Sequence, residues 1–175
     1  GSTSNPTSVI MSSAKSVTAN FVIHPNTVYF QSIGNQTVGN NFSIQVLIYN
    51  TSYLTYGTFD IRYNSSILSF VGLANTSSAI GDGTGSATPN VKSAELFTVD
   101  IDYSSYANSH SGNGVNGSGY LCTLTFSPIA SGASPLYFVS GEGTPPGELS
   151  LLKWIAYEES SITPVYWKNS SVTVQ

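Results

Sequence analysis

The sequence predicts an all-β protein built from antiparallel strands, and the prediction rests on hydrophobic period and turn chemistry. Apolar and polar residues alternate in residues 42–48 and again in residues 59–63, which is typical of half-buried strands. The apolar positions of these two runs are Phe42, Ile44, Val46, Ile48, Phe59, Ile61 and Tyr63. Asn64, Ser65 and Ser66 then form a turn before a third apolar run at residues 70–73. We expect these three strands to form a meander in one sheet.

Further strands are expected at residues 96–103, 120–126, 136–139, 162–167 and 171–174. In the first of them Phe97, Val99, Ile101 and Tyr103 share one parity, which places Asp100 and Asp102 on the opposite face. Residues 74–90 and 106–119 are rich in Gly, Ser, Thr and Asn, and both are expected to be exposed loops. Residues 141–147 are predicted as a turn, and residues 149–157 as a short helix or an irregular strand ending at a solvated Glu158-Glu159 corner.

The N-terminal region divides into a flexible start and an additional strand. Residues 1–8 are polar and contain proline, as in a flexible segment. From residue 9 a partly broken alternation continues to residue 23, longer than an ordinary strand of five or six residues. We therefore divide the chain into an extension, residues 1–19, and a domain, residues 20–175. The extension either folds back on its own sheet or adds as a strand to a neighbouring copy.

Several short stretches, taken in order, resemble cohesin modules. The clearest is FDIRY at residues 59–63 followed by NSSILSFVGL at residues 64–73, although Asn64 stands where the family usually has Asp. The others are FVIHP (21–25), VGNNF (38–42), GYLCTLTF (119–126) and SVTV (171–174). The resemblance covers residues 20–175 and implies a two-sheet antiparallel β-sandwich, a jelly roll of nine strands.

The composition argues against some classes of function and raises the question of how the protein stays soluble. Only 8% of the residues are charged, the net charge is -4, and the five basic residues are scattered, so a nucleic-acid partner is not expected. No apolar run is long enough to span a membrane. Seven Asn-x-Ser/Thr sequons offer N-linked glycans as a source of solubility, with a merely polar surface as the alternative. They are Asn35, Asn41, Asn50, Asn64, Asn75, Asn116 and Asn169.

No residue pattern predicts an enzyme, a metal site or a cofactor. His24 and His110 have no nucleophile-elbow sequence near them, and Asp82 between two glycines is a weak hint of a calcium loop. Asp100 and Asp102 are read as an outward polar face rather than an acid/base pair, and Cys122 as a small core residue. Glu95, Glu142 and Glu148 are the remaining carboxylates that could serve a glycosidase.

Composition and layout also resemble the subunits of archaeal threads, which are secreted, glycosylated β-sandwiches joined by donor-strand complementation. This resemblance implies an extracellular, cell-surface, pilus-like filament whose partner is another copy of the chain. The residues expected in the donor strand are Val9, Ile10, Met11, Val17 and Ala19. A minor hypothesis adds an isopeptide bond from Lys15 to an Asn of the next copy. The alternatives are a cohesin-type module that binds a dockerin, and a surface-layer or adhesin domain that holds carbohydrate or other cells with its tyrosines.

Overall fold

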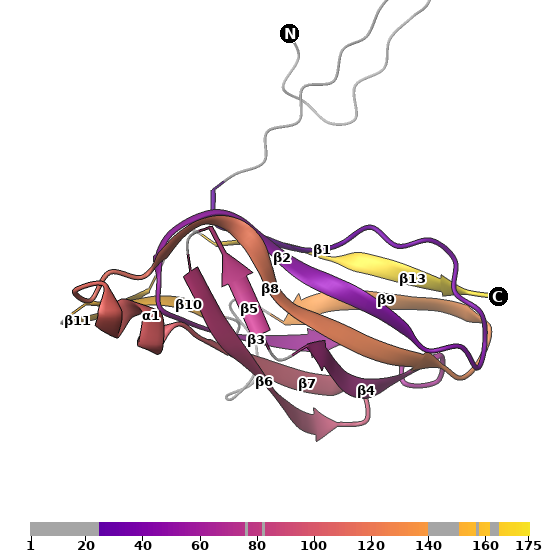
Figure 1. Ribbon diagram of the computed structural model, residues 1–175. Coiled ribbons are helices and arrows are strands. Elements are labelled where there is room, and N and C mark those ends of the chain that lie inside the picture. The colour runs from indigo at the N-terminus through magenta and orange to yellow at the C-terminus, as the bar shows by residue number, and fades with distance from the viewer. Residues whose placement is uncertain (1–24, 76, 82, 140–150, 157, 162–164) are drawn as a thin grey trace, which may run out of the picture.

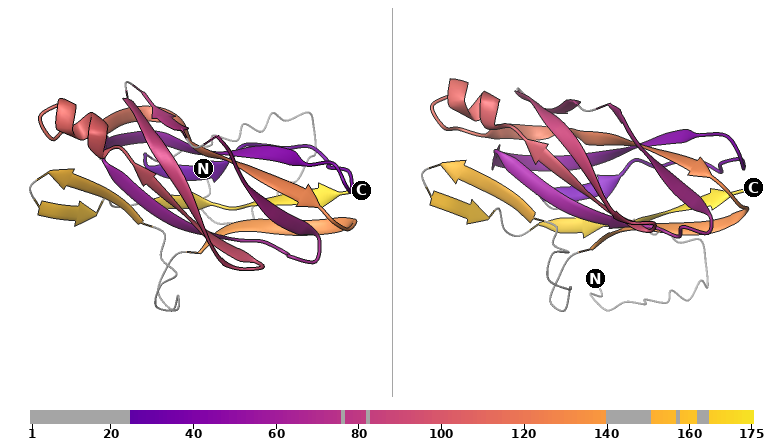
Figure 2. Two further views of the ribbon diagram at one scale, coloured as in Figure 1. Left: turned by 60° about the horizontal axis from the view of Figure 1, so that its bottom comes forward. Right: turned by 90° about the horizontal axis from the view of Figure 1, so that it is seen from below.

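The structure, a computed structural model, describes residues 25–75, 77–81, 83–139, 151–156, 158–161 and 165–175. Its described part contains thirteen strands and one short helix, α1 (Ser104–Ser109). The strands lie in two layers that face each other across a hydrophobic core, with α1 at one end and the C-terminus at the other (Figures 1 and 2). The expected all-β sandwich is confirmed, with thirteen strands in place of nine.

The first layer, here called the β3 layer, is antiparallel throughout. Its members are β3 (Tyr56–Arg62), β6 (Gly83–Ser93), β7 (Leu96–Asp102), β9 (Gly132–Val139), β10 (Leu151–Ala156), β11 (Glu158–Ser161) and β13 (Ser170–Val174). β7 lies between β3 and β6, while β9 and β10 pair with opposite ends of the other edge of β3. β13 pairs with β9, and β11 pairs with β10.

The second layer, the β2 layer, is built on the two longest strands. Its members are β1 (Thr27–Phe30), β2 (Phe42–Leu54), β4 (Leu68–Asn75), β5 (Ser77–Ile80), β8 (Val115–Pro128) and β12 (Tyr166–Lys168). β2 lies between β1 and β8, and β8 also pairs with β4 and β5. β5 continues into β6 as an antiparallel pair, so one edge of the sandwich is hydrogen-bonded from layer to layer.

Aromatic rings join the layers in the core. Phe97 of β7 stacks on Phe70 of β4 with the ring centroids 3.8 Å apart, and Phe126 of β8 lies edge-on to Phe70 at 5.7 Å. Phe138 of β9 stacks on Phe30 of β1 at 4.5 Å. The predicted inward parities are confirmed, because all the apolar positions named for residues 42–48, 59–63 and 97–103 are buried. Cys122 is fully buried in this core, as predicted.

The predicted meander is wrong. β2 and β3 are consecutive in sequence, yet β2 pairs with β1 and β8 while β3 pairs with β7, β9 and β10. Only Thr55 separates the two strands, too little for a hairpin turn, and the chain crosses there from one layer to the other. The two strands therefore cover the same core from opposite sides. Strands that face each other across a core and strands that pair in one sheet show the same alternation of apolar residues, so the sequence pattern does not distinguish the two arrangements.

Two predicted loops are also corrected. The segment expected as an exposed loop at residues 74–90 holds β5 and most of β6, with Ser78, Ile80 and Ala87 buried. Its small residues are required by close packing, since a Cβ on Gly83 would lie 2.1 Å from Val115 Cγ1. In the predicted loop 106–119, residues 106–109 belong to α1 and β8 already begins at Val115.

At the C-terminal side, residues 151–156 form a strand rather than a helix, and β13 matches the predicted last strand. Of the run predicted at 162–167, residues 162–164 lie outside the described residues, and its end belongs to β12. The extension at residues 1–19, including the donor-strand residues and Lys15, lies outside the described residues. So do His24, Asp82, Glu142, Glu148 and the turn predicted at 141–147. Within the described part, no helix is long and apolar enough to cross a membrane.

Candidate functional site

The outward side of the β3 layer is a polar surface, here called the polar face. Alternate residues of β3, β7 and β6 point away from the core, and the strand register brings them into rows. The rows are Tyr56, Asp102 and Ser86; Thr58, Asp100 and Thr88; Asp60, Thr98 and Asn90. Asp100 and Asp102 therefore lie on the outward face, as predicted, with Asp102 exposed and Asp100 half-buried.

A charged cluster holds one corner of this face together. Lys92 of β6 reaches across β7, and its Nζ lies 2.9 and 3.2 Å from the two carboxylate oxygens of Asp60 on β3. Thr98 on β7 donates its hydroxyl to Asp60 Oδ1 over 2.6 Å. Asp60 is fully buried although its parity is outward, whereas the Lys92 side chain keeps 31% of its surface in contact with solvent. The carboxylate is thus fixed by donors from two neighbouring strands.

The next row contains a tyrosine that keeps its proton at high pH. Tyr56 donates its hydroxyl to Asp100 Oδ1 over 3.0 Å. Burial, and then this hydrogen bond to a carboxylate, raise the pKa of Tyr56 to about 12. The phenol therefore remains a hydrogen-bond donor and holds the Asp100 side chain in place across the β3–β7 pair.

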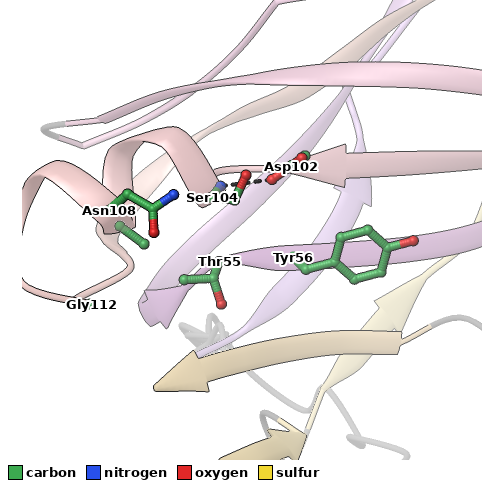
Figure 3. A pocket seen from close by; sticks show the side chains of 7 residues that line it. Thr55, Tyr56, Asp102, Ser104, Asn108 and Gly112 are labelled. Carbon is green, nitrogen blue, oxygen red and sulfur yellow. Dashed lines mark hydrogen bonds between the residues drawn. The ribbon is translucent and has the colours of Figure 1, made fainter. Parts of the chain in front are cut away.

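Where the polar face meets α1, it ends in a hollow of about 310 Å³. Tyr56 and Asp102 belong to both the face and the hollow, and the wall is completed by Thr55, Ser104, Ala107, Asn108 and Gly112. Figure 3 shows the backbone of Ser104 donating to Asp102, a bond of 2.6 Å that fixes this carboxylate at the start of the helix. The hollow extends the polar face to the end of the sandwich.

His110 does not take part in a catalytic arrangement with its nearest hydroxyl. It is exposed and stacks on Tyr106 with the ring centroids 3.9 Å apart. Its Nδ1 lies 2.9 Å from both Ser109 Oγ and the carbonyl oxygen of Tyr106. A ring nitrogen that donates to a carbonyl carries a proton, so it has no lone pair with which to activate the serine.

The candidate metal residues do not converge within the described part of the chain, where no group of three His, Cys, Asp or Glu side chains lies close enough to hold an ion. Glu95 is exposed in the turn between β6 and β7. Burial raises the pKa of the Cys122 thiol, which keeps it protonated and unreactive.

A second surface, on the outer side of the β2 layer, is rich in tyrosine. One register row crosses β5, β8, β2, β1 and β12 through Ala79, Tyr120, Leu47, Tyr29 and Lys168. Tyr49 and Tyr166 flank Thr27 in the adjoining row, and both are exposed. Sequence reasoning expected exposed tyrosines without locating them, and it missed the Asp60 cluster, because the residues of each surface come from strands far apart in the chain.

The seven sequon asparagines are all exposed. Three lie on β2, β4 and β8, and the other four lie in the connections β1–β2, β3–β4 and β12–β13, where Asn169 accepts a hydrogen bond from the backbone of β9. None lies on β3, β6, β7 or β9 as the structure describes these strands. Their exposure fits the predicted use as glycan sites, which remains a prediction.

Comparisons with known proteins identify the fold. No family model matches the chain, and no curated protein matches it. Among solved structures, the sixth cohesin of scaffoldin B from Acetivibrio cellulolyticus, in complex with a dockerin, is similar with a TM-score of 0.61 at 12% identity, over 87% of this chain and 100% of that one.

Two further cohesins are similar over most of their length. The seventh ScaB type I cohesin of Pseudobacteroides cellulosolvens gives a TM-score of 0.57 at 16% identity, over 85% of this chain and 91% of that one. A non-cellulosomal cohesin from the hyperthermophilic archaeon Archaeoglobus fulgidus gives 0.56 at 14% identity, over 86% and 90%. The chain therefore has the jelly-roll β-sandwich fold of cohesin modules.

Proposed function

We propose that this chain is an extracellular protein-binding module of the cohesin type, not an enzyme, and that the polar face receives its partner. The observation that carries the proposal is the preorganised row of side chains on β3, β7 and β6. Asp60 and Asp100 are held by hydrogen bonds of 2.6 and 3.0 Å within the face, so little side-chain freedom is lost when a partner docks.

The face also has a suitable charge and the size of an interface centre. Three strands about 4.8 Å apart and seven residues of about 3.4 Å each give a surface of roughly 14 by 24 Å. This surface covers about half of the ~600–800 Å² per partner found in small to standard interfaces, and the adjoining hollow beside α1 extends it. Asp100 and Asp102 are charged groups with hydroxyl neighbours, so the partner surface should present Lys or Arg side chains.

Two of the similar structures are complexes of a cohesin with a dockerin, and we propose a dockerin-type module as the partner here. The test is biolayer interferometry of the full chain against a panel of dockerin modules, including those bound by the scaffoldin cohesins of Acetivibrio cellulolyticus. Asn90→Arg places a bulky cation in the polar face, and Ser69→Arg places the same group on β4 in the other layer, outside every sequon, as the control.

Binding that is lost in Asn90→Arg and retained in Ser69→Arg supports the proposal, together with a fall in affinity at high salt. The proposal fails if no dockerin binds, or if both variants bind as well as the parent chain.

Head-to-tail strand donation is a second proposal, and the edge strand β4 favours it. Among the described strands β4 pairs only with β8, and Val71 on it is 56% exposed. An open strand edge can accept a strand from another chain, here residues 9–19 of a second copy. Light scattering of the full chain and of a chain beginning at Asn20 tests it: oligomers lost on truncation support donation, and two monodisperse monomers refute it.

A further inference from the structure

The structure gives the sequons a spatial order that the sequence does not show. Asn50, Asn75 and Asn116 lie on strands of the β2 layer. Asn35, Asn41, Asn64 and Asn169 lie in the connections outside the strands. All seven are exposed, so an enzyme or a sugar can reach each of them.

The side-chain contacts separate one sequon from the others. A glycan attaches through the amide nitrogen, and Asn64, Asn75 and Asn169 make their hydrogen bonds through Oδ1, to the backbone N–H of Ser66, Ser77 and Phe138 respectively. These hydrogen bonds orient the side chain through its oxygen and do not use the amide nitrogen that would carry the glycan. Asn116 differs, because its Nδ2 donates to the Gly114 carbonyl over 3.2 Å while its Oδ1 accepts from the backbone of Tyr53.

The low charge of the chain gives glycans a physical role. Charged residues are 8% of the sequence, against about 25% in an average soluble domain. The β2 layer also exposes Tyr49 and Tyr166, which would otherwise contribute to an apolar patch. Hydrophilic chains attached around this layer would keep such side chains away from other molecules.

We propose that N-linked glycans at Asn35, Asn41, Asn50, Asn64, Asn75 and Asn169 cover the β2 layer and the connecting turns and leave the polar face bare. The glycan coat directs protein partners to that face because a branched sugar excludes a docking protein from its surroundings. Only this directing role rests on the proposed binding function. The occupancy of the sites and the shielding of the β2 layer do not depend on that function.

Two lysines provide a matched test of shielding that needs no partner. Lys168 adjoins the sequon at Asn169, whereas Lys92 lies on the polar face, and both are exposed. The full chain is secreted from a host that performs N-glycosylation, the occupied sites are mapped by glycopeptide mass spectrometry, and half of the sample is treated with an endoglycosidase. Both halves then react with a bulky amine-reactive polymer, and the rate is measured at each lysine.

We expect glycans at the six sites, a severalfold faster reaction of Lys168 after the glycans are removed, and an unchanged rate at Lys92. The proposal is overturned if the six sites are unoccupied, or if deglycosylation changes both lysines equally. The ion pair with Asp60 slows the reaction of Lys92 equally in both samples. The quantity to compare is therefore, for each lysine, the ratio of its reaction rate after deglycosylation to its rate before.

A new sequon on the polar face tests the directing role. Ser86→Asn creates an acceptor site with Ala87 and Thr88 in the exposed part of β6, and Ser86→Gln places an amide there without a sequon. With a dockerin that binds the parent chain as the probe, the glycosylated Ser86→Asn protein should lose binding and Ser86→Gln should retain it. If the glycosylated variant still binds, glycans do not direct partners to the polar face, even where the six sites have been shown to be occupied. If the six sites are bare and a dockerin still binds at the polar face, the coat fails and the proposed function stands.

Discussion

Removing the ammonium of Lys92 should destabilise the protein through the carboxylate that it leaves behind. Lys92→Met keeps the aliphatic stem but removes the ion pair of 2.9 Å with Asp60, which is fully buried. Thr98 still donates its hydroxyl to Asp60 Oδ1, but the cationic partner of the carboxylate is gone. A charge in this position can neither be solvated by bulk water nor move away.

The magnitude follows from the burial of the two partners. Breaking a fully buried ion pair costs about 3–5 kcal/mol, whereas exposed pairs contribute about 0–1 kcal/mol. Since one partner is buried and Lys92 is 31% exposed, we expect a loss of about 2–3 kcal/mol in the free energy of unfolding. Adding Asp60→Asn removes the uncompensated charge, so the double variant should recover at least ~1 kcal/mol of that loss.

Urea unfolding followed by tryptophan fluorescence measures these differences, because Trp167 packs against Phe59 and Phe138 in the core. Lys168→Met, on the other layer, is the control and should stay within about 0.5 kcal/mol of the parent. A loss below about 1 kcal/mol in Lys92→Met, or a double variant less stable than Lys92→Met alone, would refute the reasoning.

Three other predictions concern the core, a close backbone contact and the alkaline limit. Phe97→Ala removes the ring that stacks on Phe70 and should cost about 3–5 kcal/mol, measured by the same urea titration; a loss under about 1 kcal/mol would show that the stack contributes little. Gly119→Ala puts a Cβ 2.0 Å from the carbonyl oxygen of Ala79, so the β5–β8 pair must separate, with an expected cost of at least ~2 kcal/mol and faster amide hydrogen exchange in β5; unchanged exchange would contradict this. The pKa of Tyr56 lies at about 12 in the folded chain against the ordinary 10.0, so its contribution to stability is complete below pH 10.0 and is lost as the pH rises to about 12; Tyr56→Phe should reduce the alkaline fall in the free energy of unfolding, and an unchanged slope would count against the raised pKa.

The strands that could be predicted from the sequence are those with one clean apolar face. β7 is an example, since Phe97, Val99 and Ile101 alternate with polar residues and are fully buried. The β5–β6 hairpin was missed because its buried positions include Ser78, Gly83 and Ala87, residues that a periodicity analysis counts as loop formers. Small side chains at these positions reflect close approach to β8 and α1 rather than exposure.

The polar face could be predicted only in part. The outward parity of Asp100 and Asp102 follows from β7 alone. The cluster of Asp60, Thr98 and Lys92 could not be predicted, since Asp60 on β3 is 38 residues from Thr98 on β7 and 32 from Lys92 on β6, and long-range strand pairing brings them together. The same limit explains the wrong meander: an alternating pattern shows which side of a strand is buried but not which strand lies beside it.

The burial of Cys122 makes the chain its own reporter of unfolding. It is the single sulfhydryl of the sequence, and it lies on β8 opposite Val46 of β2 with its side chain fully buried in the core, where no reagent in solution can reach it. A thiol-specific probe can therefore modify the protein only in molecules whose sandwich has opened, and the slow rate of that reaction gives the population of the open form. Oxidation likewise cannot link two folded copies through a disulfide, so a reducing agent should leave any assembly of folded copies intact.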